Sequence, residues 1–176
     1  MEYLGLERHM WNRVRINKKN KTKDEPYKEV IELAEFGDVE AAYNKLVNIS
    51  YDMNDFWQYT IQKVYDEISP EKFYIFLMYL YIKTGNEDCN LYMAGQMVYN
   101  RPFTDDPYQF AFYHINKAIN NRPDEIKYKE FLIDYIYDYP VKFMSHEEYV
   151  EIARQILEKN PNHQKSLKIL NERKQE

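Results

Sequence analysis

A helical hydrophobic period runs almost without interruption through the chain after Pro26, and this feature limits the possible folds more than any other. In residues 53–68 the apolar side chains recur at the spacing of one helix face through four turns, with Thr60 as the only semi-polar member. No comparable stretch alternates with a period of two. The pattern predicts an all-α fold with helices near residues 27–36, 38–50, 53–68, 70–84, 88–101, 106–121, 124–138, 145–159 and 162–174.

Turn and capping residues separate these segments at regular intervals. Gly37-Asp38 is typical of one helix ending and the next beginning, and Ser69-Pro70 and Asp106-Pro107 place a capping side chain before a proline at the first helical position. Ser145-His146-Glu147-Glu148 matches a capping box. With only 4 Gly and 7 Pro, the chain has too few turn residues for a β-sandwich or barrel. Short helices joined by tight turns should pack as antiparallel hairpins.

Residues 90–123 carry a pattern found in one repeat family. Ala94-Gly95 precedes Tyr99 by one turn, and the next predicted helix carries small and large apolar residues before a proline: Ala111, Ile115, Ala118 and Pro123. The stretch resembles the tetratricopeptide (TPR) and Sel1-like helical-repeat family. Pro123 and Pro161 occupy equivalent places 38 residues apart, close to the period of such repeats. Residues 53–84 depart from the pattern, because bulky aromatic residues replace the small ones there.

The resemblance implies an architecture and a mode of action. It implies a right-handed α-α superhelix of about four helical hairpins with a C-terminal capping helix. Residues 26–176 would form one helical-repeat domain, preceded by a basic arm at residues 1–25. Such families act as adaptors or regulators that bind a protein or peptide through the concave face.

Charge is unevenly distributed between these two parts. Residues 1–25 carry seven basic and four acidic side chains, a net charge of +3, within a chain of net charge −5. The remaining residues therefore carry −8, which suits a basic partner and disfavours nucleic acid. A partly disordered leader is the plainer interpretation of the basic arm, and a short helix within it is the alternative.

Sequence motifs of catalysis or metal binding are not found. The four histidines lie far apart in sequence, and His114 is expected to be a satisfied, partly buried imidazole. Asp52, Glu87-Asp88 and Asp105-Asp106 fit helix N-caps better than calcium ligands. We therefore expect no enzymatic activity, no cofactor and no metal ion.

Location is predicted from the same residues. The most apolar run, residues 73–82, is too short to cross a bilayer, which takes roughly 20 residues. The first residues lack the apolar core of a signal peptide, and Cys89 is the single thiol, expected to be inert. These features predict a cytoplasmic protein without a membrane anchor.

Outward-looking positions on the first helix of each hairpin are the predicted contact surface. In the repeat frame they are Tyr92, Gln96 and Tyr99 in one hairpin, and Lys127, Glu130, Asp134 and Tyr137 in the next. Tyrosine is favoured where proteins grip partners, although the 18 tyrosines could equally fill helix crossings.

Three functions remain open at this point. The first is a non-catalytic protein- or peptide-binding module. The second is an acidic immunity-type protein that neutralises a basic toxin or nuclease. The third is a nucleic-acid-associated regulator that uses the basic arm.

Overall fold

A computed structural model describes residues 25–49, 52–53, 55–57, 59–60, 68–100 and 105–172. All regular secondary structure in these ranges is helical, which confirms the predicted all-α fold. The elements are α2 (Glu25–Glu35), α3 (Val39–Asn48), α5 (Pro70–Thr84), α6 (Asp88–Asn100), α7 (Pro107–Asn121), α8 (Ile126–Phe131), the π-helix η1 (Leu132–Ile136), α9 (His146–Lys159) and α10 (Gln164–Glu172). The predicted basic arm lies outside the described residues except for its last residue.

Capping residues stand where the sequence indicates at three helix starts. The Asp38 carboxylate accepts the Ala41 backbone N–H at 3.0 Å. Ser69 accepts the Lys72 backbone N–H at 3.3 Å. Ser145 and Glu148 form the expected reciprocal capping box at the start of α9.

The fourth capping prediction is wrong. Asp106 precedes α7, but its side chain makes no hydrogen bond to the first turn of that helix. One carboxylate oxygen instead accepts the Tyr139 hydroxyl at 3.3 Å. The carboxylate therefore ties the start of α7 to the loop that follows η1, a contact that local sequence cannot reveal.

The predicted helix at 124–138 is also modified. It begins at Ile126, and its second half winds as the π-helix η1, in which the Tyr137 backbone N–H donates to the Leu132 carbonyl at 3.1 Å. Leu132, Ile133 and Ile136 of this turn are all buried. Tight packing of this segment thus accompanies the change in helix type.

Helices that follow each other in the chain pack as antiparallel neighbours. The most extensive contact is between α6 and α7, and small residues lie in it. Ala94 on α6 and Ala111 and Ala118 on α7 are fully buried. Small side chains at these positions let the two helix axes approach closely, as the sequence pattern predicts.

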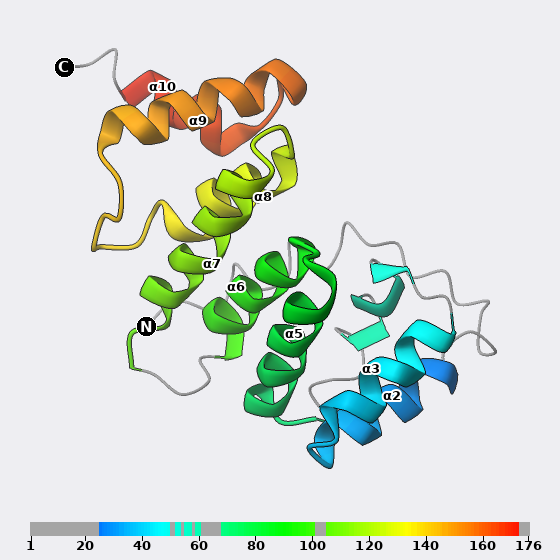
Figure 1. The fold of residues 1–176 in the computed structure, drawn as a ribbon. Coiled ribbons are helices and arrows are strands. Elements are labelled where there is room, and N and C mark those ends of the chain that lie inside the picture. The colour runs from blue at the N-terminus through cyan, green and yellow to red at the C-terminus, as the bar shows by residue number, and fades with distance from the viewer. Residues whose placement is uncertain are drawn as a thin grey trace.

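Helices of successive hairpins lie side by side and run in the same direction. Along α5 and α7, Tyr74 bonds His114 and, further on, Tyr81 lies under Lys117. Along α6 and the α8–η1 segment, Asp88 bonds Tyr128 and, further on, Tyr99 contacts Tyr135. Figure 1 shows the resulting elongated body, with α2 and α3 at one end and α9 and α10 at the other.

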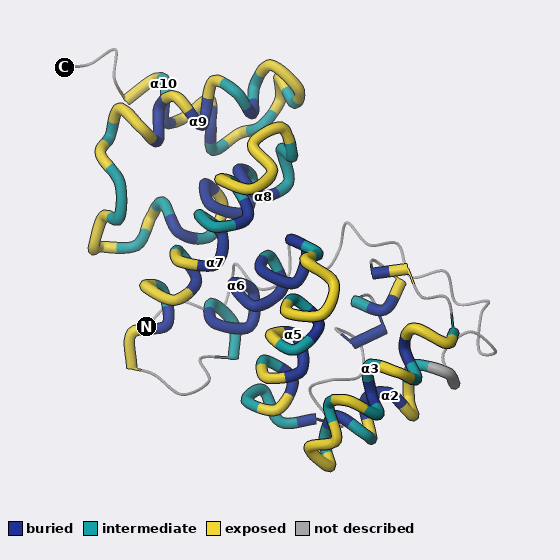
Figure 2. Tube along the Cα trace, in the orientation of Figure 1, coloured by how far each residue is buried: buried dark blue, intermediate teal, exposed yellow. Residues whose placement is uncertain are grey.

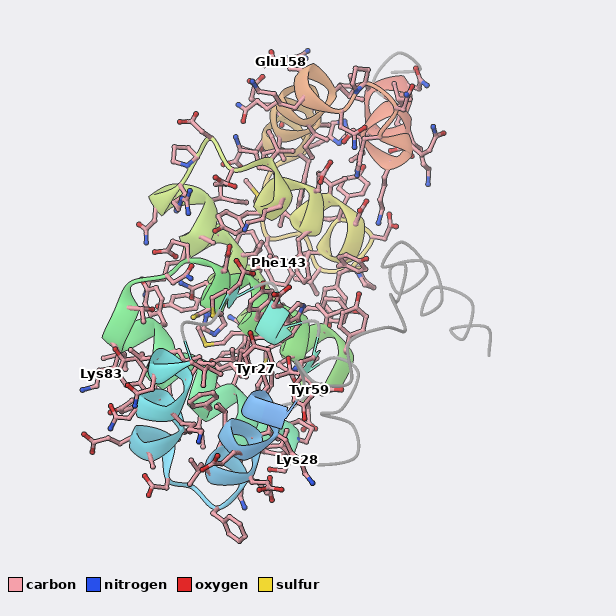
Figure 3. All side chains as sticks on the ribbon, turned by 90° about the vertical axis from the view of Figure 1, so that its right-hand side faces the viewer. Tyr27, Lys28, Tyr59, Lys83, Phe143 and Glu158 are labelled. Carbon is pink, nitrogen blue, oxygen red and sulfur yellow. The ribbon has the colours of Figure 1, made fainter. Side chains whose placement is uncertain are left out.

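The core runs through the whole body. Two clusters of buried apolar residues fill its two halves, and Tyr74 and Leu91 pack against both. Figure 2 shows α6 buried over most of its length at the junction. At the α2 end, Tyr27 packs against Tyr59 with ring centroids 5.6 Å apart, while Lys28 projects to the surface (Figure 3).

No helix within the described ranges is both long enough and apolar enough to cross a bilayer.

Candidate functional site

Two of the predicted contact residues, Tyr92 and Gln96, lie inside the protein. Tyr92 is 4% exposed and Gln96 is 6% exposed, so the prediction that they look outward is wrong. The Trp57 indole stacks on the Tyr92 ring with centroids 4.0 Å apart. The Trp57 side chain therefore covers the side of α6 that the repeat pattern predicted to be exposed. Tyr99, on the last turn, is half-buried and meets the Tyr135 ring edge-on at 5.8 Å.

Two residues on α8 contact neighbouring elements. Lys127 forms an ion pair with Asp88 at the start of α6. Glu130 accepts a hydrogen bond from the Asn160 side chain at 2.9 Å. These side chains therefore connect hairpins of the same chain.

The last two predicted residues face the C-terminal helix. Asp134 lies 3.2 Å from Nε2 of His163, just before α10. The Tyr137 hydroxyl donates to the Glu172 carboxylate at 3.1 Å. The expected capping helix thus packs on the surface from which Asp134 and Tyr137 project.

A buried polar chain links α5, α6 and α7. The Tyr74 hydroxyl lies 2.6 Å from Nε2 of His114, and Nδ1 of His114 lies 2.9 Å from the side-chain oxygen of Asn90. An amide oxygen can only accept, so Nδ1 of His114 carries the hydrogen and Nε2 accepts from Tyr74. Both nitrogens of a neutral imidazole are therefore occupied.

The chain ends on the carboxylate of Glu87, which is 6% exposed. One oxygen of Glu87 accepts from the Asn90 amide at 2.8 Å, and the other accepts from Asn121 at 2.8 Å and from the Tyr81 hydroxyl at 3.3 Å. Three donors from three helices compensate the buried negative charge.

Burial determines the protonation state of the histidine. It lowers the pKa of His114 to about 4, and the nearby Lys117 ammonium adds to the effect. The pKa of the Tyr74 hydroxyl is raised, first by burial and then by Tyr113. A neutral imidazole with two partners, next to a phenol that keeps its proton, fits a cross-link between helices better than an acid–base pair.

A second buried contact extends this cross-link to α8. The Tyr128 hydroxyl donates to Asp88 at 2.7 Å, and burial together with this bond raises the pKa of Tyr128. The expected capping role of Glu87-Asp88 passes to Asn86, whose side-chain oxygen accepts the Asp88 backbone N–H at 3.0 Å. The sequence predicts that the His114 imidazole is hydrogen-bonded, but the residues that bond it, Tyr74 and Asn90, are known only from the structure.

Asp52 and Cys89, which the sequence also singled out, have structural rather than catalytic roles. Asp52 accepts the Asp55 backbone N–H at 3.0 Å, as expected of a cap. Cys89 is fully buried, and burial raises its pKa to about 12, so its reactive thiolate form is suppressed. Across the described part of the chain, no three His, Cys, Asp or Glu side chains are grouped so that they could hold a metal ion.

An apolar area on the outer side of α5 and α7 is the strongest candidate for a contact surface. We define the α5–α7 surface by its exposed members, which are Ile75, Met78, Ile82, Phe110 and Tyr113. Ile82 is 72% exposed and Tyr113 is 58% exposed. The Tyr74 and Tyr81 contacts to α7 hold the two helices that carry these side chains next to each other. Exposed apolar side chains on neighbouring helices are typical of interaction sites.

Comparisons of the chain with protein-family models, with curated proteins and with solved structures found no match.

Proposed function

We propose that this chain is a non-catalytic protein-binding module with a TPR- or Sel1-like architecture. In this proposal about four hairpins stack into a right-handed superhelix that α10 caps. Contacts one repeat apart support it. Tyr43 meets Tyr79 at a sequence separation near that of Tyr99 and Tyr135, while Asp88 bonds Tyr128 across 40 residues.

The observation that carries the binding role is the α5–α7 surface. Packing of the core does not explain why Ile82 and Tyr113 are largely exposed. Their exposure therefore favours a partner that covers them. Aromatic and aliphatic side chains at the centre of an interface supply most of its binding energy.

The proposed contact area differs from the one expected from the sequence. Tyr92 and Gln96 are buried, and Lys127, Glu130 and Tyr137 contact other parts of the same chain. The side chains of the α5–α7 surface are more exposed than Tyr92 and Gln96 and therefore more accessible to a partner.

Affinity capture with paired variants tests the proposal. Wild-type protein and Ile82→Asp, which places a charge in the α5–α7 surface, are used to capture proteins from native lysate with quantitative mass spectrometry. We expect Ile82→Asp to lose a dominant partner by about tenfold or more. Gln109→Ala, an exposed polar position on α7, is the matched control and should retain that partner.

Two results would contradict the proposal. One is that Ile82→Asp, with an unchanged circular dichroism spectrum, captures every partner at wild-type level. The other is that Tyr99→Ala, on the surface predicted from the repeat frame, abolishes capture while Ile82→Asp does not.

A further inference from the structure

The last described helix, α10, lies at one end of the body and is attached to η1 through charged side chains (Figure 1). His163, directly before α10, lies 3.2 Å from the Asp134 carboxylate of η1. The Lys165 ammonium lies 2.8 Å from the Asp138 carboxylate and donates to the Asp134 backbone carbonyl at 2.7 Å. Two basic side chains at the start of α10 therefore lie on two carboxylates that are one turn of helix apart.

The apolar part of this contact is small. Two of the nine residues of α10, Ser166 and Ile169, are buried, whereas α9 buries five. Ser166 bonds the His163 ring at 2.9 Å within the same turn, so Ile169 is the fully buried apolar side chain that α10 adds to the core. A short helix held in this way opens more readily than the interior of a domain, because water and salt weaken its ion pairs.

The surface beneath α10 already holds a helix, and its side chains indicate which kind of helix it accepts. We define the η1 seat by the residues that bond α10, which are Asp134, Tyr137 and Asp138. Its two carboxylates select basic side chains, and the Tyr137 hydroxyl donates to the Glu172 carboxylate at the end of α10 at 3.1 Å. The net charge of −8 on residues 26–176 favours a basic occupant as well.

We propose that α10 is an autoinhibitory strap on the η1 seat, and that a basic amphipathic helix of a partner protein binds there by displacing it. The partner helix carries basic residues in the places of His163 and Lys165 and an aliphatic residue in the place of Ile169. Because the partner competes with a segment tethered to the same chain, closure of α10 lowers the apparent affinity of the partner. The η1 seat is separate from the α5–α7 surface, so this inference goes beyond the proposed function.

A peptide with the sequence of residues 160–172 is the probe for an open seat. The fluorescently labelled peptide is titrated with the full chain, and binding is followed by anisotropy. In the chain, Lys165→Glu places a carboxylate opposite Asp138 and should release α10. We therefore expect this variant to bind the peptide about tenfold more tightly than the wild type does. Lys168→Glu is the matched control, because Lys168 is exposed and pairs with Glu172 inside α10, and it should bind the peptide as weakly as the wild type.

Peptide variants test the chemistry of the occupant. Against the Lys165→Glu chain, a peptide with glutamine in place of both His163 and Lys165 should bind about tenfold less tightly. A peptide that keeps these two residues, Ile169 and Glu172, with alanine at the other helical positions, should retain its affinity. Binding would then depend on the types of side chain that reach the seat and not on the remainder of the α10 sequence.

A charge exchange separates release of α10 from misfolding. Asp138→Lys added to Lys165→Glu forms the ion pair again with its charges exchanged. In hydrogen exchange followed by mass spectrometry, the amides of residues 164–172 should exchange about tenfold faster in Lys165→Glu than in the wild type. In the double variant they should return toward the wild-type rate.

The outcomes distinguish this inference from the proposed function. Equal peptide affinity of the wild type and Lys165→Glu overturns it, as does the absence of binding to both, or an affinity that is indifferent to the basic residues of the peptide. A wild-type dimer in sedimentation that the peptide dissociates overturns it in favour of α10 from a second copy. Ile82→Asp should leave every peptide affinity unchanged, so the proposed function stands or fails separately.

Discussion

Tyr74 on α5 donates its hydroxyl hydrogen to Nε2 of His114 on α7, with 2.6 Å between oxygen and nitrogen across 40 residues of sequence. The bond joins two helices that belong to successive hairpins, and it lies beside the exposed Tyr113. The buried cross-link and the proposed contact surface therefore share the same pair of helices. Stability and binding can be tested separately because the side chains involved differ.

Replacement of His114 should destabilise the fold. His114→Leu leaves the Tyr74 hydroxyl and the Asn90 amide oxygen without this partner, and we expect a loss of about 2–4 kcal/mol in the free energy of unfolding. Urea denaturation followed by circular dichroism measures it. The control His146→Ala, at a partly exposed position in the first turn of α9, should change stability by less than about 0.5 kcal/mol. Equal effects of the two variants would contradict a cross-linking role.

The same histidine should contribute a pH dependence of stability. Its pKa is lowered to about 4 in the folded protein from about 6.5 in the unfolded chain, so between these values the unfolded chain binds more protons. Stability from this group is therefore complete above about pH 6.5, falls as the pH drops, and levels off below about pH 4. Its total is at most about 3 kcal/mol.

A difference measurement isolates this contribution from the titration of carboxylates. The free energy of unfolding is measured from pH 7.5 to 4 for the wild type and His114→Gln. We expect the wild type to lose more stability than the variant over the acid half of that range. Parallel curves would mean that His114 titrates alike in both states.

Gly95→Ala should be tolerated and slightly stabilising. The resemblance to the repeat family suggests that Gly95 is needed for helix approach, but among the described residues a Cβ there would meet only the Trp57 side chain, at the ordinary contact distance of 3.9 Å. Alanine in a helix interior is worth about 0.5–1 kcal/mol over glycine. Thermal unfolding should show a higher Tm for Gly95→Ala.

Gly85→Ala provides the matched contrast. Gly85 ends α5 with φ of +64°, a conformation that side chains with a Cβ disfavour. This variant should lose about 1 kcal/mol. A destabilised Gly95→Ala would show that α6 and its neighbours approach more closely than the structure indicates.

Cys89 should resist thiol reagents in the folded protein. Its side chain is fully buried and its pKa is raised to about 12, so both access and thiolate formation are suppressed. Reaction with an aromatic disulfide reagent, followed by absorbance, should be slow in buffer and rapid in urea. Rapid reaction without denaturant would contradict the burial of this residue.

Local patterns determined the helical class and most helix boundaries. Ser69, Gly85 and the Ser145–Glu148 box act within one turn of chain, so their chemistry is readable from neighbouring residues alone. The small residues Ala94, Ala111 and Ala118 likewise announce a close helix crossing, because a crossing needs small side chains whatever surrounds it.

Tertiary structure alone decided which polar groups meet and which faces are covered. Glu87 looks like a helix cap in sequence, but it is surrounded by donors that lie up to 34 residues away. Tyr92 looks outward in a repeat frame until Trp57, 35 positions earlier, stacks upon it. Periodicity specifies the direction of a side chain around its own helix, whereas burial depends on what packs against that side, and this is a property of the assembled chain.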